Sequence, residues 1–200
     1  MPSHHRFTTS VIAIVLAGCG AREATPTTPP PVAVARTHAP YTDADVDFMQ
    51  GMIVHHGQAL DMTALVPERS ANPTLEVLAQ RIELTQLNEI ERMARWLRDR
   101  GEAVPDEGAY REHAAGHAGH MPGMLAADEM ERLASADGTV FDRLFLEYMI
   151  RHHEGALTMV AELQAAGGGL EAEIYRFAAD VDADQRAEIA RMQSMLTNTP

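Results

Sequence analysis

The chain has 200 residues, a formal net charge of −13 and a hydrophobic fraction of 46 %, with only 5 % aromatic residues. This length and apolar content suffice for one ordinary domain with its own core. The acidic balance argues against a nucleic-acid partner, because the phosphate backbone requires a basic protein face. Methionine and histidine are numerous, at 12 and 10 residues, and lysine is absent.

The beginning of the chain has the pattern of an export signal followed by a tether. Residues 1–18 include the apolar run VIAIVLAG, which is too short to span a bilayer, and the LAGC that ends at Cys19 resembles a bacterial lipobox. We expect an exported lipoprotein that is lipidated on Cys19, its only cysteine, and anchored in a membrane on the periplasmic or cell-surface side. The alternatives are an ordinary signal peptide and no export. Residues 19–40 are rich in proline and threonine, which predicts an extended tether.

Residues 41–200 are the predicted folded domain, which opens with a helix. Thr42 is a good N-cap, and Asp45, three residues later, completes a capping box. This helix is expected to end near Leu65, because Pro67 cannot continue it.

A second helix is predicted from the cap at Asn72, with Pro73 in its first turn, to a stop at Gly101. Its apolar positions are Leu75, Leu78, Ile82, Leu84, Ile90, Met93 and Leu97. The elements expected after it are a long loop over 102–124, a short helix over 127–135, a long helix over 139–166 and a last helix over 170–196.

One pattern occurs twice in the domain. FMQGMIVHHGQALDM at 48–62 returns 97 residues later as FLEYMIRHHEGALTM at 145–159, and the helix that follows each copy also matches its counterpart, at an offset of 99 residues. The repeats cover about 43–100 and 139–197. Two copies of one helical hairpin, each with one apolar stripe, would most simply bury those stripes against each other. The prediction is an all-α four-helix bundle made of two repeated helical hairpins with approximate two-fold symmetry, with the loop and the short helix between them.

The repeated His-His pairs are the candidate functional residues. At about 100° per residue, both histidines of each pair lie on or beside the apolar stripe, so four imidazoles converge on one interior. The opposite face of the first helix carries Gln50, Gly57 and Asp61, with Val54 as the exception. The candidate metal ligands are Met52, His55, His56, Met62, Met149, His152, His153 and Met159. The candidates for orienting these ligands, spaced i and i+4 on the partner helices, are Glu89, Met93, Glu188 and Met192.

Two interpretations of the histidines remain open. Buried imidazoles need partners, and Glu89 and Glu188 can satisfy them by hydrogen bonding without a metal. The same carboxylates can instead orient imidazoles that bind a metal ion. The predicted loop adds accessory metal candidates, although it is equally consistent with a His-rich loop of no function. These candidates are His113, His117, His120, Met121 and Met124. Imidazole with thioether and no thiolate favours Cu(I) or Ag(I).

These motifs, together with MPGM at 121–124, resemble the CopM-like family of exported bacterial proteins, long catalogued as a domain of unknown function. The resemblance covers about residues 43–196. It implies a ferritin-like four-helix bundle and, for some members, copper binding and a part in copper resistance. The residues that the resemblance carries over by position are Met52, His55, His56, Met149, His152 and His153, followed by the methionines and histidines of the loop.

The function expected is therefore a lipid-anchored protein that sequesters Cu(I) or Ag(I) or passes it to a copper-handling protein. It is not expected to be an enzyme, since no pairing of a nucleophile with a base stands out. The alternative is a structural or adaptor lipoprotein in which the histidines and glutamates form a polar network without metal. A di-iron oxidase is disfavoured, because its Glu-x-x-His pairs are missing from the sequence.

Overall fold

The computed structural model describes residues 40–105 and 121–198, and these residues form α-helices and no β-strand. The helices are α1 (Asp43–Ala64), α2 (Val66–Arg69), α3 (Pro73–Arg100), α5 (Ala127–Ala134), α6 (Gly138–Ala165) and α7 (Ala172–Asn198). Within the described ranges, no helix combines the length and the apolar character needed to cross a membrane. Four predictions concern residues outside these ranges: the signal segment 1–18, lipidation of Cys19, the tether up to residue 39, and the loop histidines His113, His117 and His120.

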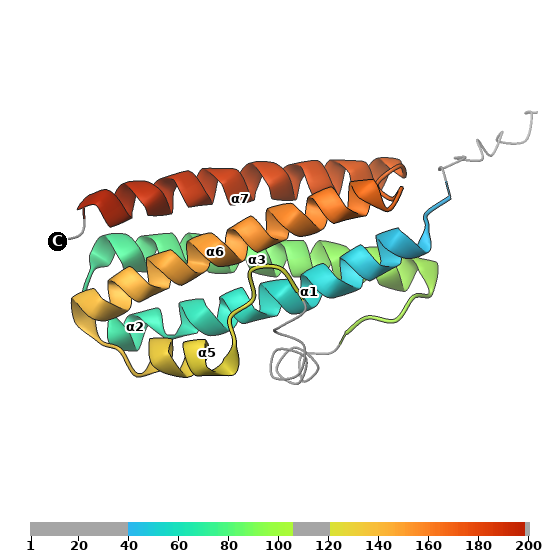
Figure 1. Cartoon of the computed structure of the whole chain (residues 1–200). Coiled ribbons are helices and arrows are strands. Elements are labelled where there is room, and N and C mark those ends of the chain that lie inside the picture. Colours follow the sequence, from blue (N-terminus) through green and yellow to red (C-terminus); the bar gives the residue numbers. More distant parts are fainter. Residues whose placement is uncertain (1–39, 106–120, 199–200) are drawn as a thin grey trace, which may run out of the picture. The chain divides into compact units, whose positions relative to one another are not determined.

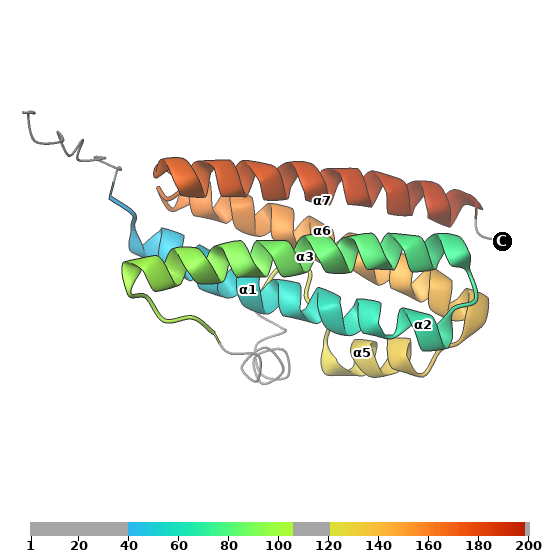
Figure 2. The same cartoon turned by 180° about the vertical axis from the view of Figure 1, so that it is seen from behind.

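The four long helices α1, α3, α6 and α7 run side by side, as two opposite views agree (Figures 1 and 2). Helix α1 packs along α3, α6 packs along α7, and α1 and α6 join the two pairs. The short helix α5 lies beside α6. The described residues thus confirm the prediction of an all-helical fold.

The predicted helix starts are confirmed by their hydrogen bonds. Thr42 and Asp45 form the expected capping box, and Asn72 caps α3 while Gly101 ends it in a left-handed conformation with φ 75°. The Asp45 carboxylate has a second role, because its Oδ1 accepts the backbone N–H of Gly169 at 2.6 Å. One buried side chain therefore joins the start of α1 to the turn between α6 and α7.

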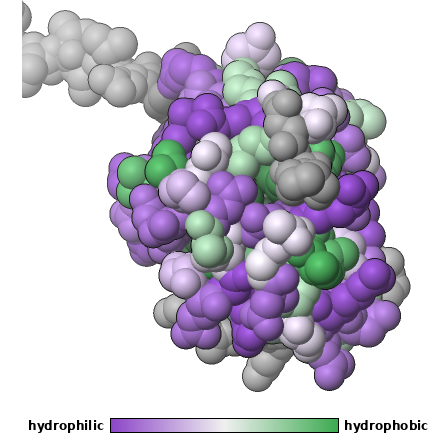
Figure 3. All heavy atoms as spheres, turned by 90° about the vertical axis from the view of Figure 1, so that its left-hand side faces the viewer, coloured by the Kyte–Doolittle hydropathy of each residue, from purple (hydrophilic) through white to green (hydrophobic). Residues whose placement is uncertain are grey.

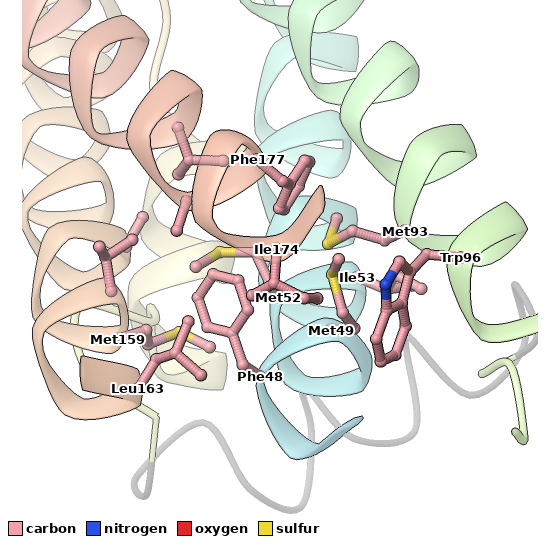
Figure 4. Close-up of a cluster of buried hydrophobic side chains, with 14 of the residues drawn as sticks. Phe48, Met49, Met52, Ile53, Met93, Trp96, Met159, Leu163, Ile174 and Phe177 are labelled. Atoms are coloured by element: carbon pink, nitrogen blue, oxygen red, sulfur yellow. The ribbon is translucent and has the colours of Figure 1, made fainter. Parts of the chain in front are cut away.

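The apolar core divides into two clusters. The first cluster contains Phe48, Met49, Met52, Met93, Trp96, Met159 and Phe177, among others (Figure 4). The second contains Met62, Leu75, Ile82, Phe141, Phe145, Met149 and Met192, among others. Each long helix contributes to both clusters, so the clusters occupy different lengths of the same helices.

Two expectations about exposure are wrong. Leu84 is one of the predicted apolar positions of α3, but it is 65 % exposed. Helix α1 has no solvated outer face between residues 52 and 59, where every residue is buried, including Val54 and Gly57. The segment that precedes α5 is hydrogen-bonded to His55 and Gln58 of α1. On the end of the domain seen in Figure 3 the surface is mainly hydrophilic, with apolar residues in separate small groups.

Candidate metal centre

A polar layer separates the two apolar clusters. Along each long helix, the residues that contribute to one cluster are followed by buried polar residues and then by residues of the other cluster. The polar layer consists of His55 and His56 on α1, Gln86 and Glu89 on α3, His152 and His153 on α6, and Gln185 and Glu188 on α7. All eight side chains are buried, and Glu188 is the most exposed of them at 7 %. The four imidazoles therefore lie in the interior, as the helical spacing predicts.

The second histidine of each pair is bonded to a glutamate. His56 Nε2 lies 2.6 Å from Glu89 Oε2, and His153 Nε2 lies 2.6 Å from Glu188 Oε2. A carboxylate only accepts, so Nε2 is the donating nitrogen in both pairs. The two predicted carboxylate partners thus contact the histidines of their own hairpin, with the same atoms and at the same distance.

The first histidine of each pair lies against its counterpart from the other hairpin. The rings of His55 and His152 have centroids 3.9 Å apart and are tilted by 36°. His152 Nε2 donates to the backbone oxygen of His55 at 3.1 Å, and His55 Nε2 donates to that of Pro122 at 3.1 Å. Both acceptors are carbonyls, which fixes the proton of each ring on Nε2.

Burial holds these two rings in the neutral form. Desolvation, reinforced by repulsion from His56, lowers the pKa of His55 to about 3, and its bond to Pro122 opposes this only in part. The pKa of His152 is also well below its usual value, first because of burial and then because of repulsion from the other three histidines. A neutral ring whose proton is on Nε2 carries a lone pair on Nδ1. The interior therefore holds two unprotonated imidazole nitrogens of the kind that metal ions require.

Buried polar atoms without a hydrogen-bond partner are concentrated in this layer. Of the twelve such side-chain atoms among the described residues, nine belong to its members. They are Nδ1 of His55, His56, His152 and His153, Oε1 of Glu89, and both amide atoms of Gln86 and Gln185. Each such atom costs roughly 1–3 kcal/mol, so native structures contain few of them, and nine in one layer single it out as the candidate site.

A short segment, Met121–Leu125, lies against α1 and α6 beside the His55–His152 pair, and we call it the strap. The carbonyl oxygen of Pro122 accepts from His55, as described above. The side-chain amide of Gln58 makes two hydrogen bonds to the backbone of Leu125, at 2.7 and 2.9 Å. Just beyond the strap, both carboxylate oxygens of Glu129 accept from Arg151 of α6 at 2.7 Å. The strap is thus fastened to both helices.

The strap explains one difference between the two copies of the motif. Gln58 of the first copy corresponds to Gly155 of the second. A Cβ atom on Gly155 would lie 2.0 Å from the Pro122 oxygen, so only glycine allows the strap to approach α6. One copy therefore supplies the amide that holds the strap, and the other supplies the space for it.

The predicted methionines are not gathered around the histidines but divided between the two apolar clusters. Met52, Met93 and Met159 are in the first cluster, and Met62, Met149 and Met192 are in the second. Met124 is buried in the strap and Met121 is half-buried. Within residues 40–105 and 121–198, no three histidine, aspartate or glutamate side chains are placed to share one ion as they stand.

Sequence reasoning missed Gln58, Pro122 and the two buried glutamines. Gln86 and Gln185 did carry a signal, because they recur at the repeat offset and lie one turn before Glu89 and Glu188. A polar residue on an apolar stripe, present in both copies, indicates a buried polar site. Nothing periodic distinguishes Gln58 or Pro122.

A family comparison matches residues 45–196 to the domain of unknown function DUF305. The chain belongs to the DUF305 family. A DUF305 fragment from Deinococcus radiodurans has 33 % sequence identity and a TM-score of 0.67, covering 80 % of this chain and 99 % of its own. A DUF305 protein from Streptomyces coelicolor, described as secreted, has 28 % identity and a TM-score of 0.66, covering 78 % of this chain and 92 % of its own. No curated protein sequence matches the chain.

CopM is a third structural relative. Its Cu(II)-bound form has 30 % identity and a TM-score of 0.63, covering 77 % of this chain and 96 % of its own. CopM has also been solved in Cu(I)-bound, Ag-bound and apo forms. The predicted resemblance to CopM-like proteins is therefore confirmed.

Proposed function

We propose that this protein binds Cu(I) or Ag(I) outside the cytoplasm, anchored by a lipid on Cys19, and sequesters the ion or passes it to a copper-handling protein. The ion is cargo, and no reaction is assigned to the protein. The proposal includes a ferritin-like four-helix bundle of two repeated hairpins. The relatives that support it are CopM, solved with copper and silver, and the Streptomyces protein described as secreted.

One observation carries the proposal: the four buried histidines all engage Nε2 and all leave Nδ1 without a partner. Glu89 and Glu188 hold the Nε2–H of two rings, as carboxylates commonly do for imidazoles that bind metal ions. Met52 and Met149 are each one turn from a histidine of their own helix, in the apolar clusters on either side of the polar layer, and they are the proposed sulfur ligands. These residues fit a soft ion bound through Nδ1 and thioether sulfur.

A polar network without metal is the second candidate. It is favoured by the hydrogen bonds that already occupy every Nε2 atom. A network of this kind would also hold the helices in one register. The two candidate functions predict different Cu(I) binding when the Nδ1 atoms are removed and the hydrogen bonds made by Nε2 are kept.

Anaerobic titration with Cu(I) against a chromophoric chelator separates the candidates. The matched variant changes His55, His56, His152 and His153 to Gln, because a glutamine amide can still donate in place of Nε2–H but has no Nδ1 lone pair. Tight binding that this folded variant loses supports the proposal. Equal binding by both proteins would move the site to the methionines and histidines of the predicted loop. Binding by neither would leave a polar network and remove the copper function.

A further inference from the structure

The four imidazoles of the polar layer are closed off from solvent. The exposed fractions of His55, His56, His152 and His153 are 0 % or 1 %. A solute can therefore reach a ring nitrogen only if part of the fold moves. Displacing any of the four long helices would expose apolar surface, because each of them contributes to both apolar clusters. The strap is the non-helical segment that contacts these rings.

The ring edge of His55 is directed at the strap. His55 Nε2 donates to the Pro122 oxygen at 3.1 Å, and the ring of His152 lies against that of His55 with a centroid distance of 3.9 Å. Met121, Pro122 and Gly123 are half-buried, so the strap reaches from the imidazole edge to the surface. In Figure 1 the strap is the yellow segment that crosses α1 and α6 before α5 begins. Moving it would uncover the edge of His55 without separating the long helices.

Few contacts hold the strap in place. His55 donates one hydrogen bond to it, and the Gln58 amide makes two hydrogen bonds to the backbone of Leu125. The Leu125 side chain is buried in the second apolar cluster. On α6 the strap rests on Gly155, whose missing side chain leaves room for the Pro122 oxygen. Local opening of a segment with so few contacts requires much less free energy than displacing a helix of the core.

We propose that the strap is a gate whose opening admits solutes to the imidazoles of His55 and His152. The inference rests on the proposed function only for the identity of the ion that passes. Gln58 holds the gate closed from α1, because its two hydrogen bonds break when the strap leaves that helix. Entry and release both require the open state, so the closed strap slows the exchange of whatever the layer holds.

The side of the layer between α3 and α7 is the competing route. Arg92 of α3 and Asp180 of α7 form an ion pair across this side, at 2.9 Å. A solute that entered here would meet His56 and His153 first, because the glutamates bonded to these two rings come from α3 and α7. A solute that entered under the strap would meet His55 first. The order in which the histidines react therefore identifies the route.

Diethyl pyrocarbonate measures access directly, because it modifies a neutral imidazole that it can reach. The metal-free full-length protein is treated at pH 7, and mass spectrometry follows each histidine. We expect Gln58→Ala to raise the rate at His55 and His152 by roughly ten- to a hundredfold, the effect of two ordinary hydrogen bonds on an opening equilibrium. Gln50→Ala is the matched control and should react at the native rate. Gln50 also joins α1 to loop backbone, through the oxygen of Ala103 at 2.7 Å.

Gly155→Ala should also raise these two rates, and Gly51→Ala should not. Equal rates in the native protein and in Gln58→Ala would overturn the proposal. It would also be overturned by an equal rise at all four histidines, which indicates global unfolding, or by a rise in Arg92→Ala that matches the rise in Gln58→Ala. Ag(I) binding is measured separately on the same proteins. If no silver binds, the proposed function fails, while the modification rates still decide whether the strap is a gate.

Discussion

Each histidine of the polar layer is oriented by one hydrogen bond, and the identity of the acceptor divides the four rings into two kinds. His56 and His153 donate to carboxylates, whereas His55 and His152 donate to backbone carbonyls. A carboxylate that accepts from Nε2 makes the Nδ1 lone pair a stronger ligand for a metal ion. A backbone carbonyl does so to a smaller extent. The layer therefore offers nitrogen donors of two strengths within one interior.

Removing one partner of a histidine–glutamate pair should be costly. We expect Glu89→Ala to lower the free energy of unfolding by roughly 1–3 kcal/mol, because His56 Nε2 would be left buried without an acceptor. Glu83, exposed on the same helix, is the control, and Glu83→Ala should change stability by less than about 0.5 kcal/mol. Urea unfolding of the metal-free proteins at pH 7 measures both. Equal effects would mean that the Glu89 contact contributes nothing specific.

Stability of the metal-free protein should fall in acid. The pKa of His55 is depressed to about 3 in the folded state and is near 6.5 when the chain unfolds, and the pKa of His152 is also well below its usual value in the folded state. As the pH falls, these two histidines therefore become protonated in the unfolded chain at a higher pH than in the folded protein. The stabilising contribution is complete above pH 6.5 and is lost as pH falls from about 6.5 toward 3, by up to about 1.4 kcal/mol per pH unit for each ring.

Urea midpoints at pH 7, 6 and 5 measure this slope, and His55→Gln/His152→Gln is its control. The variant lacks both depressed groups and should show a shallower decline over the same range. A native protein whose midpoint is constant between pH 7 and pH 5 would show that these rings are not held neutral.

At the scale of the elements, the close approach of the strap to α6 depends on the absence of a side chain at Gly155. We expect Gly155→Ala to destabilise the protein by roughly 1–3 kcal/mol, because its Cβ would overlap the Pro122 oxygen and push the strap from α6. Gly51 is the matched helical glycine, with only the flexible end of Met159 nearby, at 3.4 Å. Gly51→Ala should stabilise by about 0.5–1 kcal/mol through helix propensity.

Thermal melting ranks the two variants, and hydrogen exchange at Leu125, whose N–H is bonded to Gln58, reports whether the strap has loosened. Faster exchange in Gly155→Ala with native exchange in Gly51→Ala is the expected pair of results. The same exchange rate in all three proteins would show that the strap is held without the close contact at Gly155.

The helices were predictable from local signals, and the strap was not. Thr42, Asn72 and Gly101 mark helix ends through the chemistry of their own side chains and backbone, so neighbouring residues suffice to find them. The inward direction of the histidines follows from helical periodicity. The bond between His55 and Pro122 depends on a segment 67 residues farther along the chain. Helical periodicity does not predict a contact between segments so far apart in sequence. The only sequence feature that indicates it is the replacement of Gln58 in the first copy by Gly155 in the second.

At the scale of the whole molecule, we expect the polar layer between the two apolar clusters to cost stability. Apolar pairs of similar volume often match or exceed a buried ionic pair, by up to about 4 kcal/mol. We expect His56→Leu/Glu89→Leu together with His153→Leu/Glu188→Leu to unfold at a higher or equal temperature and to lose Cu(I) binding. Calorimetry and the chelator titration measure the two properties on one sample.

The variants with a single change are the comparison. His56→Leu alone leaves Glu89 without its partner, so this variant should unfold at a lower temperature than the variant in which both residues are changed. Full copper binding by the four-residue variant would show that the histidine–glutamate pairs take no part in the site. A lower melting temperature would show instead that the polar layer supports the fold.

The strap lies against one side of a layer that is otherwise duplicated. His55 donates to Pro122, but its counterpart His152 donates to His55, so residues that match in sequence are chemically different positions. An ion held by one hairpin would then differ in affinity, in exchange rate and in spectrum from an ion held by the other. Occupancy would rise in two steps, and a pattern that looks like a doubled site would act as an ordered pair, with one half filling before the other.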